Sequence, residues 1–287
     1  MARIYLLGTG TPTPTPQRFG TAYVLQLDEE YLMVDCGPAT TYKLVRAGLF
    51  PTQIDYLFFT HHHFDHNADY ACFLLCRWDQ STGKEGRLSV FGPTPTKWIT
   101  DRLIGPEGAF SCDWRARVGA PVSQHVHLNR GGALPRPEPC VDVRDIEPGQ
   151  VFSRPHWRAT AARVVHVQPW LDSLAYRVDV AERSIVFAGD TGFCQAAVEL
   201  ARGADVLVVN CWDHQAMMEQ NGEAAGQTGT LDAARMAQLA GVRRLILTHT
   251  GAKLSAPGSR EKAVADISTI YGGEIVFGEE MMVLELW

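Results

Sequence analysis

The sequence lacks an apolar run that could cross a bilayer, and it lacks a leader-like segment. No stretch of the 287 residues approaches the roughly 20 apolar residues that a membrane-spanning helix requires. Met1 to Gly8 shows no charged region followed by an apolar run and a cleavage site, so we expect no signal peptide. We therefore predict a cytoplasmic protein without a membrane partner.

Positive charge is also scarce. The chain has 26 Lys and Arg against 32 Asp and Glu, which gives a formal net charge of -6. Nucleic-acid binders usually carry a basic face, so this balance argues mildly against that class. The seven cysteines are odd in number and show no recurring short spacing, which favours reduced thiols over a disulfide framework.

Apolar segments broken by Gly and Pro predict many strands in the first half of the chain and a mixture of strands and helices in the second. Two packed sheets flanked by helices fit this order better than a doubly wound sheet. We expect strands at 3–7, 21–27, 31–35, 54–59, 87–91, 141–145, 157–166, 174–180, 184–188, 205–210, 243–248, 274–277 and 281–286. We expect helices at 40–47, 67–78, 95–104, 194–202, 230–240 and 260–271.

The chain is predicted to form one domain over 1–287. Its composition, 46% hydrophobic, is ample for one large core. Residues 92–140 are rich in Pro and Gly and form the one candidate insertion. Because long insertions often serve as lids or partner surfaces, we predict that this segment covers the active site or forms a dimer surface.

Four potential metal ligands follow the strand at 54–59 within six residues: His61, His63, Asp65 and His66. In an extended backbone, side chains alternate, so His61 and His63 point to the same side and His62 points away. Asp65 and His66 lie on the turn into a helix and can serve a neighbouring position. This segment can therefore supply ligands to two adjacent metal ions. A set of imidazole and carboxylate ligands suits zinc, manganese or iron.

Three later polar residues stand where predicted strands end. His166 closes the segment 157–166, Asp190 follows the strand at 184–188, and His249 follows the strand at 243–248. A scaffold presents active-site groups at such positions, although each residue alone could be a turn or cap residue.

Candidates for the group that protonates the leaving oxygen follow the strand at 205–210. Asp213 and His214 could face the metal edge there, with capping of the next segment as the alternative. Gln227 cannot transfer a proton and could only position a substrate. Asp65 is counted as a catalytic residue as well as a ligand.

These residues together resemble the metallo-β-lactamase superfamily. The resemblance rests on Thr60-His61-His62-His63-Phe64-Asp65-His66, His166, Gly189-Asp190-Thr191 and Thr248-His249. Leu7-Gly8-Thr9-Gly10 and Asp35-Cys36-Gly37 look like its ribonuclease Z-like branch, as does the segment from Ala240-Gly241-Val242 to His249. The match covers the chain apart from about 92–140.

The resemblance implies an α+β four-layer αββα sandwich with two divalent metal ions at one sheet edge, zinc being favoured. It implies His61, His63 and His166 on one metal. It implies Asp65, His66 and His249 on the other metal, with Asp190 bridging the two. Asp35 would support the His segment.

The chain departs from true ribonuclease Z in three places. Only 23 residues separate His166 from Asp190, too few for that family's RNA-gripping arm. Its His-Glu-Ala-Thr stretch is replaced by Asn210-Cys211-Trp212-Asp213, and an expected catalytic His is Gln227. RNA is therefore a disfavoured partner, and a small-molecule ester is the expected substrate.

The sequence thus predicts a dinuclear metal-dependent hydrolase that uses a metal-bridging hydroxide to cleave a small ester, most simply a phosphodiester. One alternative is a lactone or sulfate-ester hydrolase of the same fold. Another is a metal-binding sensor or scaffold without turnover. Analogy with similar folds leaves a homodimer open.

Overall fold

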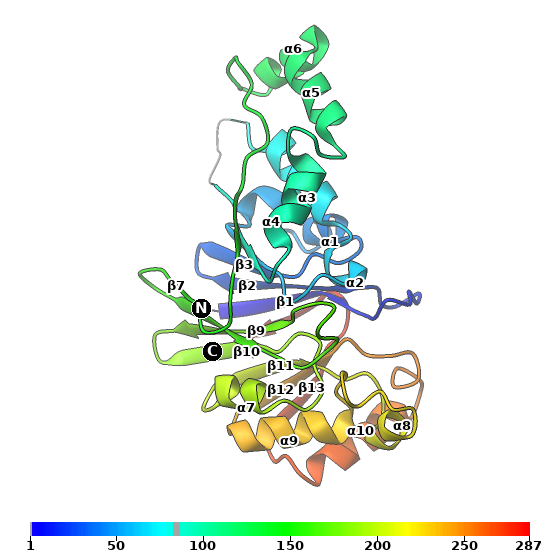
Figure 1. The fold of residues 1–287 in the computed structure, drawn as a ribbon. Coiled ribbons are helices and arrows are strands. Elements are labelled where there is room, and N and C mark those ends of the chain that lie inside the picture. Colours follow the sequence, from blue (N-terminus) through cyan, green and yellow to red (C-terminus); the bar gives the residue numbers. More distant parts are fainter. Residues whose placement is uncertain (1, 83–86) are drawn as a thin grey trace.

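The computed structural model describes residues 2–82 and 87–287. Two sheets of seven strands pack face to face, and helices cover the outer face of each sheet (Figure 1). This is the four-layer α+β sandwich that the sequence predicts. Within the described residues, no helix is long and apolar enough to cross a membrane.

The first sheet has the order β14-β1-β2-β3-β4-β5-β6. Strands β3 to β6 run parallel to one another, whereas β1 pairs antiparallel with both β2 and β14. The strands are β1 (Ala2–Thr9), β2 (Thr21–Leu27), β3 (Glu30–Val34), β4 (Tyr56–Phe58), β5 (Ser89–Gly92), β6 (Asp142–Asp145) and β14 (Met282–Glu285). The central strands are covered on both faces, which explains why β2 and β4 read as nearly continuous apolar runs.

The second sheet has the order β13-β12-β11-β10-β9-β8-β7. Strands β10 to β13 are parallel, and β7 to β10 form an antiparallel meander. The strands are β7 (Val151–Ser153), β8 (Arg158–Arg163), β9 (Leu174–Val180), β10 (Arg183–Phe187), β11 (Val206–Asn210), β12 (Arg244–Thr248) and β13 (Glu274–Phe277). The carboxyl ends of parallel strands meet at one edge of a sheet, which is where open sheets place ligands.

Helices lie on both outer faces. Those beside the first sheet are α1 (Thr40–Arg46), the short 3-10 helix η1 (Pro51–Gln53), α2 (Phe64–Asn67), α3 (Tyr70–Gln80) and α4 (Thr96–Ile104). Those beside the second sheet are α7 (Gln195–Ala201), α8 (Gln215–Gln220), α9 (Thr230–Ala240) and α10 (Ser259–Ser268). Helices α5 (Ser111–Gly119) and α6 (Pro121–Asn129) project beyond α3 (Figure 1).

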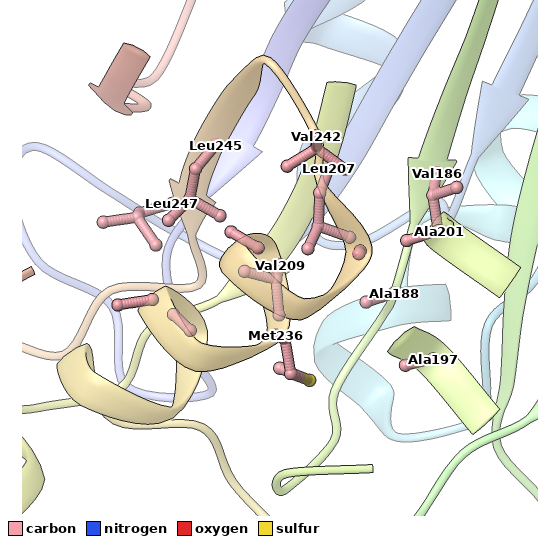
Figure 2. Packing of buried hydrophobic residues seen from close by; sticks show 14 of the residues in the cluster. Val186, Ala188, Ala197, Ala201, Leu207, Val209, Met236, Val242, Leu245 and Leu247 are labelled. Carbon is pink, nitrogen blue, oxygen red and sulfur yellow. The ribbon is translucent and has the colours of Figure 1, made fainter. Parts of the chain in front are cut away.

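Helix α9 shows how the sequence determines the packing of a helix against the second sheet. Its small apolar residues and Met236 are buried and face the second sheet, so that the backbone approaches the strands closely. Figure 2 shows Met236 beside Val209, with Leu207, Leu245 and Leu247 of the neighbouring strands in the same cluster. Gly241 ends the helix with φ 70°, a left-handed conformation that glycine adopts without steric cost.

Several elements differ from the sequence-based expectation. The predicted strand 157–166 ends at Arg163, so His166 lies in the following loop rather than at a strand end. Helices α2, α5, α6 and α8 and strand β7 were not predicted. The residues around α5 and α6 carry too many Pro and Gly to show a helical period, and α2 and α8 are too short to show one.

The segment after α4, residues 105–140, is here named the α5–α6 arm. It is attached to α3 through Asp79, which accepts hydrogen bonds from Arg117, Arg130 and Arg136 at 3.3, 2.9 and 2.8 Å. The Arg136 guanidinium also lies 4.1 Å from the centre of the Trp78 ring. Within one chain the arm stands away from α2 (Figure 1). A lid or dimer surface on residues 92–140 therefore stays a prediction, and the single domain over 1–287 is likewise proposed.

Replacing Asp79 by alanine is expected to loosen the arm without changing metal content, because three arginines lose their shared acceptor. Limited proteolysis should show faster cleavage within residues 105–140. Burial alone raises the pKa of Asp79, but Arg136 and Arg130 bring this pKa below its ordinary value. The stabilisation is therefore present above the unfolded pKa of about 3.9 and is lost as pH falls through the lower folded pKa. Unchanged cleavage of Asp79→Ala, compared with the native chain and with Glu107→Ala on the exposed surface of the arm, would contradict this attachment.

Candidate metal centre

Asp35 anchors the His-rich segment between β4 and α2. Its Oδ1 accepts from the Thr60 backbone N–H at 2.7 Å, and its Oδ2 accepts from the Thr60 hydroxyl and His66 Nδ1, both at 2.8 Å. The backbone of Asp35 is left-handed, with φ 61°. Such conformations cost about 1–3 kcal/mol in non-glycine residues and cluster at functional sites. Asp35 therefore has the supporting contacts that the resemblance implies.

Three imidazoles converge at the exposed side of this segment. His61 Nε2 lies 3.0 Å from His63 Nδ1, and His166 Nε2 lies 3.2 Å from the same His63 nitrogen. His166 Nδ1 lies 2.7 Å from the Gly226 carbonyl oxygen and therefore carries the proton that it donates. This tautomer leaves the lone pair of His166 Nε2 facing the other two rings.

A second group gathers at the buried side, where α2 meets the end of β12. His249 Nε2 lies 3.1 Å from Asp65 Oδ2, and His66 Nε2 lies 3.6 Å from the same oxygen. His249 follows β12 with φ 50°, again left-handed, which turns its side chain out of the strand direction. These three residues offer one carboxylate and two imidazoles in one small volume.

Asp190 lies between the two groups. Its Oδ1 is 3.6 Å from His66 Nε2 and its Oδ2 is 3.3 Å from His249 Nε2. The ligand atoms of His61, His66 and Asp190 all lie within 4.8 Å of one another, as do those of each of the other two groups. The structure thus brings all seven predicted ligands together in three overlapping groups, and their division between two metals stays a prediction.

The pKa shifts of three predicted ligands favour a bound cation. Burial, followed by the neighbouring His66, holds the pKa of His61 well below its ordinary value. Burial would raise the pKa of Asp190, but His249 and His66 bring it well below its usual range. Burial would lower the pKa of His66, but Asp35 and Asp190 raise it well above normal. A divalent cation at His66 Nε2 would be favoured by the same carboxylates that favour a proton there.

Unpartnered buried atoms provide a test of whether a metal fits. Among the described residues, Asp65 Oδ1 and His66 Nε2 are buried and have no hydrogen-bond partner. Native structures seldom leave such atoms unsatisfied unless an ion or a catalytic role explains them. Nitrogen and carboxylate donors are the ligands that zinc and similar divalent ions take. The residues present therefore fit divalent metal binding.

The residues proposed as proton donors have other partners. Asp213 is buried and accepts from the His214 backbone N–H at 2.8 Å. His214 Nε2 lies 2.9 Å from the Ser259 hydroxyl, and Nδ1 lies 3.9 Å from Asp266 Oδ2. Neither has a hydrogen bond or ion pair with the seven predicted ligands in the described part of the chain. His62 points away from the centre, as predicted, with Nε2 2.7 Å from the Thr96 hydroxyl.

Asn210 and Gln227 form a contact that the sequence reasoning missed. Gln227 Nε2 donates to Asp190 Oδ2 at 3.0 Å, and its Oε1 faces the Asn210 amide. When the Asn210 amide is reversed, its nitrogen donates to the Gly189 and Thr191 carbonyls and its oxygen accepts from Thr228. Gln227 lies between Asn210 and Asp190, and its Nε2 donation supports the central carboxylate.

Trp212 lies on the other side of the centre. Its ring stacks on His249, with centroids 5.6 Å apart and an angle of 29° between the planes. Trp212 thus lies beside His249, whereas Trp170 is 87% exposed. The signal in the sequence for Trp212 is its position shortly after strand β11.

Comparisons with known proteins agree with this fold. Residues 15–74 match the Metallo-beta-lactamase superfamily and residues 110–250 match the Beta-lactamase superfamily domain. A ribonuclease Z of Mycolicibacterium paratuberculosis is 30% identical over 292 residues, covering 98% of this chain and 97% of the relative.

Two solved structures share the fold over nearly the whole length. The metallo-beta-lactamase fold protein YhfI from Bacillus subtilis has a TM-score of 0.75 at 20% identity, covering 99% of this chain and 98% of its own. A diphosphatase from the PhnP family has a TM-score of 0.68 at 15% identity, covering 99% and 96%. The chain therefore belongs to the metallo-β-lactamase superfamily, in its ribonuclease Z-like branch, and is a metal-dependent hydrolase.

Proposed function

We propose that the chain is a dinuclear hydrolase of a phosphodiester. His61, His63 and His166 would hold one ion, Asp65, His66 and His249 the other, and Asp190 would contact both. The observation that carries this proposal is the convergence of these seven side chains, with ligand atoms of each group within 4.8 Å of one another. When bound, two divalent ions, zinc by preference, supply Lewis acidity and lower the pKa of water so that a nucleophile forms near neutral pH.

The protein's own contribution is to fix the ligands and their tautomers. Asp35 accepts from His66 Nδ1, and the Gly226 carbonyl accepts from His166 Nδ1, so that each Nε2 is free to bind. Asp65, His66 and His249 are fully buried, which keeps bulk water from that group. His63 and His166 are only partly buried, so a substrate would approach from their side.

A phosphodiester is favoured among esters by the relatives. The ribonuclease Z relative and the PhnP-family diphosphatase are both named for cleavage of bonds to phosphorus. RNA is the second candidate substrate, because the ribonuclease Z match spans nearly the whole of both chains. The expectation that RNA is disfavoured therefore has no support from the relatives.

The proposal is tested with a panel of chromogenic phosphodiesters, sulfate esters and lactones, together with a precursor transfer RNA. We expect turnover of a phosphodiester that is abolished by a chelator and restored by a divalent metal. Turnover confined to lactones or sulfate esters would overturn the substrate assignment. Cleavage of the RNA at rates above those of small diesters would establish the second candidate.

Gln227→His is expected to change which leaving groups are accepted. The native enzyme has an amide beside Asp190, so its rate should fall steeply as the pKa of the leaving phenol rises. A histidine there can donate a proton, and general acid catalysis contributes about 100-fold or more for poor leaving groups. A series of substituted aryl phosphodiesters measures this slope, with Gln227→Leu as the control. A native rate independent of the leaving group would contradict the prediction.

A further inference from the structure

A cavity with charged side chains in its wall includes Ala252, three residues after His249 of the proposed metal centre. Its volume is about 620 Å³, and it opens between the loop that follows β1 and the loop that follows β12. The two loops are joined directly after His249, where the Thr250 N–H donates to the Thr9 carbonyl at 3.0 Å. The charged residues of its wall are Arg18, Arg260, Glu279 and Glu280.

Arg18 is the buried cation of this cavity. Its side chain is part of a residue only 5% exposed, and its NH1 donates to the Thr9 hydroxyl and the Gly278 carbonyl, both at 2.6 Å. Among the described residues, no carboxylate lies within ion-pair distance of Arg18. Burial, followed by the nearby Arg260, lowers the pKa of Arg18, and Glu279 and Glu280 oppose this shift only in part. A buried guanidinium without a carboxylate is costly unless an anion completes its environment.

The two carboxylates of the wall are already neutralised. Glu280 pairs with Lys43 at 2.6 Å and accepts from the Phe19 backbone N–H at 2.9 Å. Glu279 pairs with Arg260 at 2.6 Å. Each carboxylate of the wall thus already has a cationic partner, which leaves Arg18 as the wall cation without an ion pair among the described residues.

Arg260 provides a separate indication of an anion. Its Nε is buried and has no hydrogen-bond partner among the described residues. Arg260 is also the second residue of α10, a helix of ten residues whose N-terminus carries partial positive charge. The planar guanidinium of an arginine can donate two parallel hydrogen bonds to two phosphate oxygens, and its positive charge complements the charge of the phosphate.

We propose that this cavity binds a phosphoryl group of the substrate other than the one at the scissile bond. The preferred substrate then carries at least two phosphate groups. The role in catalysis rests on the proposed phosphodiester hydrolysis, whereas anion binding rests on the cavity alone. The two claims can therefore fail separately.

Anion binding is tested by calorimetric titration of the full chain, as purified with its metals, with inorganic sulfate. Sulfate resembles phosphate in shape and charge and is a weak ligand of divalent metals. We expect saturable binding that weakens about tenfold or more in Arg260→Met, the loss of a charge-assisted hydrogen bond. Arg18→Lys keeps the buried positive charge but loses the planar guanidinium, so it should also weaken sulfate binding. Arg46→Met, on the exposed side of α1, is the control. Equal affinity in all four proteins would overturn the proposal.

The catalytic role is tested with two aryl phosphodiesters that differ by one distal phosphate. We expect Arg260→Met to raise KM about tenfold for the substrate with the distal phosphate and to leave kcat and the other substrate unchanged. Equal KM effects on both substrates would overturn this role. If no ester is turned over but sulfate binding follows the variants, the proposed function fails while the anion site stands.

Discussion

Replacing Asp190 by alanine is expected to abolish turnover and to lower metal occupancy. Asp190 lies against His66 and His249, as Asp65 does, but its ligand atom is also grouped with that of His61, so its loss removes the carboxylate that both groups of imidazoles share. Removal of a single electrostatic contributor costs about 10²–10³ in rate, and a ligand shared by two ions should cost at least the upper value. Initial rates and elemental analysis on the same preparation measure both effects.

Asp205→Ala is the matched control for this variant. Asp205 is also buried and also adjoins a strand of the second sheet, but it lies at the amino end of β11 and bonds Ser184 and Arg183. We expect it to lower stability and to keep the metals. If Asp190→Ala kept full occupancy and rate while Asp205→Ala lost them, the assignment of Asp190 would be wrong.

Replacing Asp35 by alanine is expected to have the second largest effect, on stability and on metal affinity together. The buried carboxylate accepts three hydrogen bonds, and breaking a buried ionic partner costs about 3–5 kcal/mol. Loss of a group that orients a ligand weakens metal affinity about 10–100-fold. Denaturant unfolding in the presence of a chelator isolates the first effect, and competitive zinc titration measures the second.

Asp35→Asn separates charge from shape at the same position. The amide can still accept from the Thr60 N–H but no longer favours a proton on His66 Nδ1. We expect most of the stability to return while the metal affinity stays low. If both variants bound zinc as tightly as the native chain, Asp35 would have only a structural role.

The positions of the seven candidate ligands could be predicted from the sequence because their signals are local. A His-x-His-x-Asp-His run after a buried strand fixes where four side chains point, and Asp190 and His249 follow apolar runs that can only be strands. The two sheets follow from the same alternation of apolar runs and turns. His166 was placed at a strand end, although it lies in a loop three residues beyond β8, because its apolar neighbours extend the strand pattern.

The features of the site that could not be predicted depend on contacts between distant parts of the chain. His214 was expected to be a proton donor, yet its ring lies against Ser259 of α10, which no local pattern reveals. The contact of Gln227 with Asp190 spans 37 positions and was missed for the same reason. Arg18 shows no sequence signal for its burial, which arises only when the loop after β1 meets residues near the carboxyl end.

Metal content of the native chain is the most direct measurement of the central claim. Elemental analysis of the purified protein is compared with that of a variant carrying His63→Ala and Asp190→Ala. We expect close to two divalent ions per native chain, a large loss in the variant and a parallel loss of phosphodiester turnover. A native protein that binds no divalent metal after incubation with zinc, manganese or iron would contradict the account.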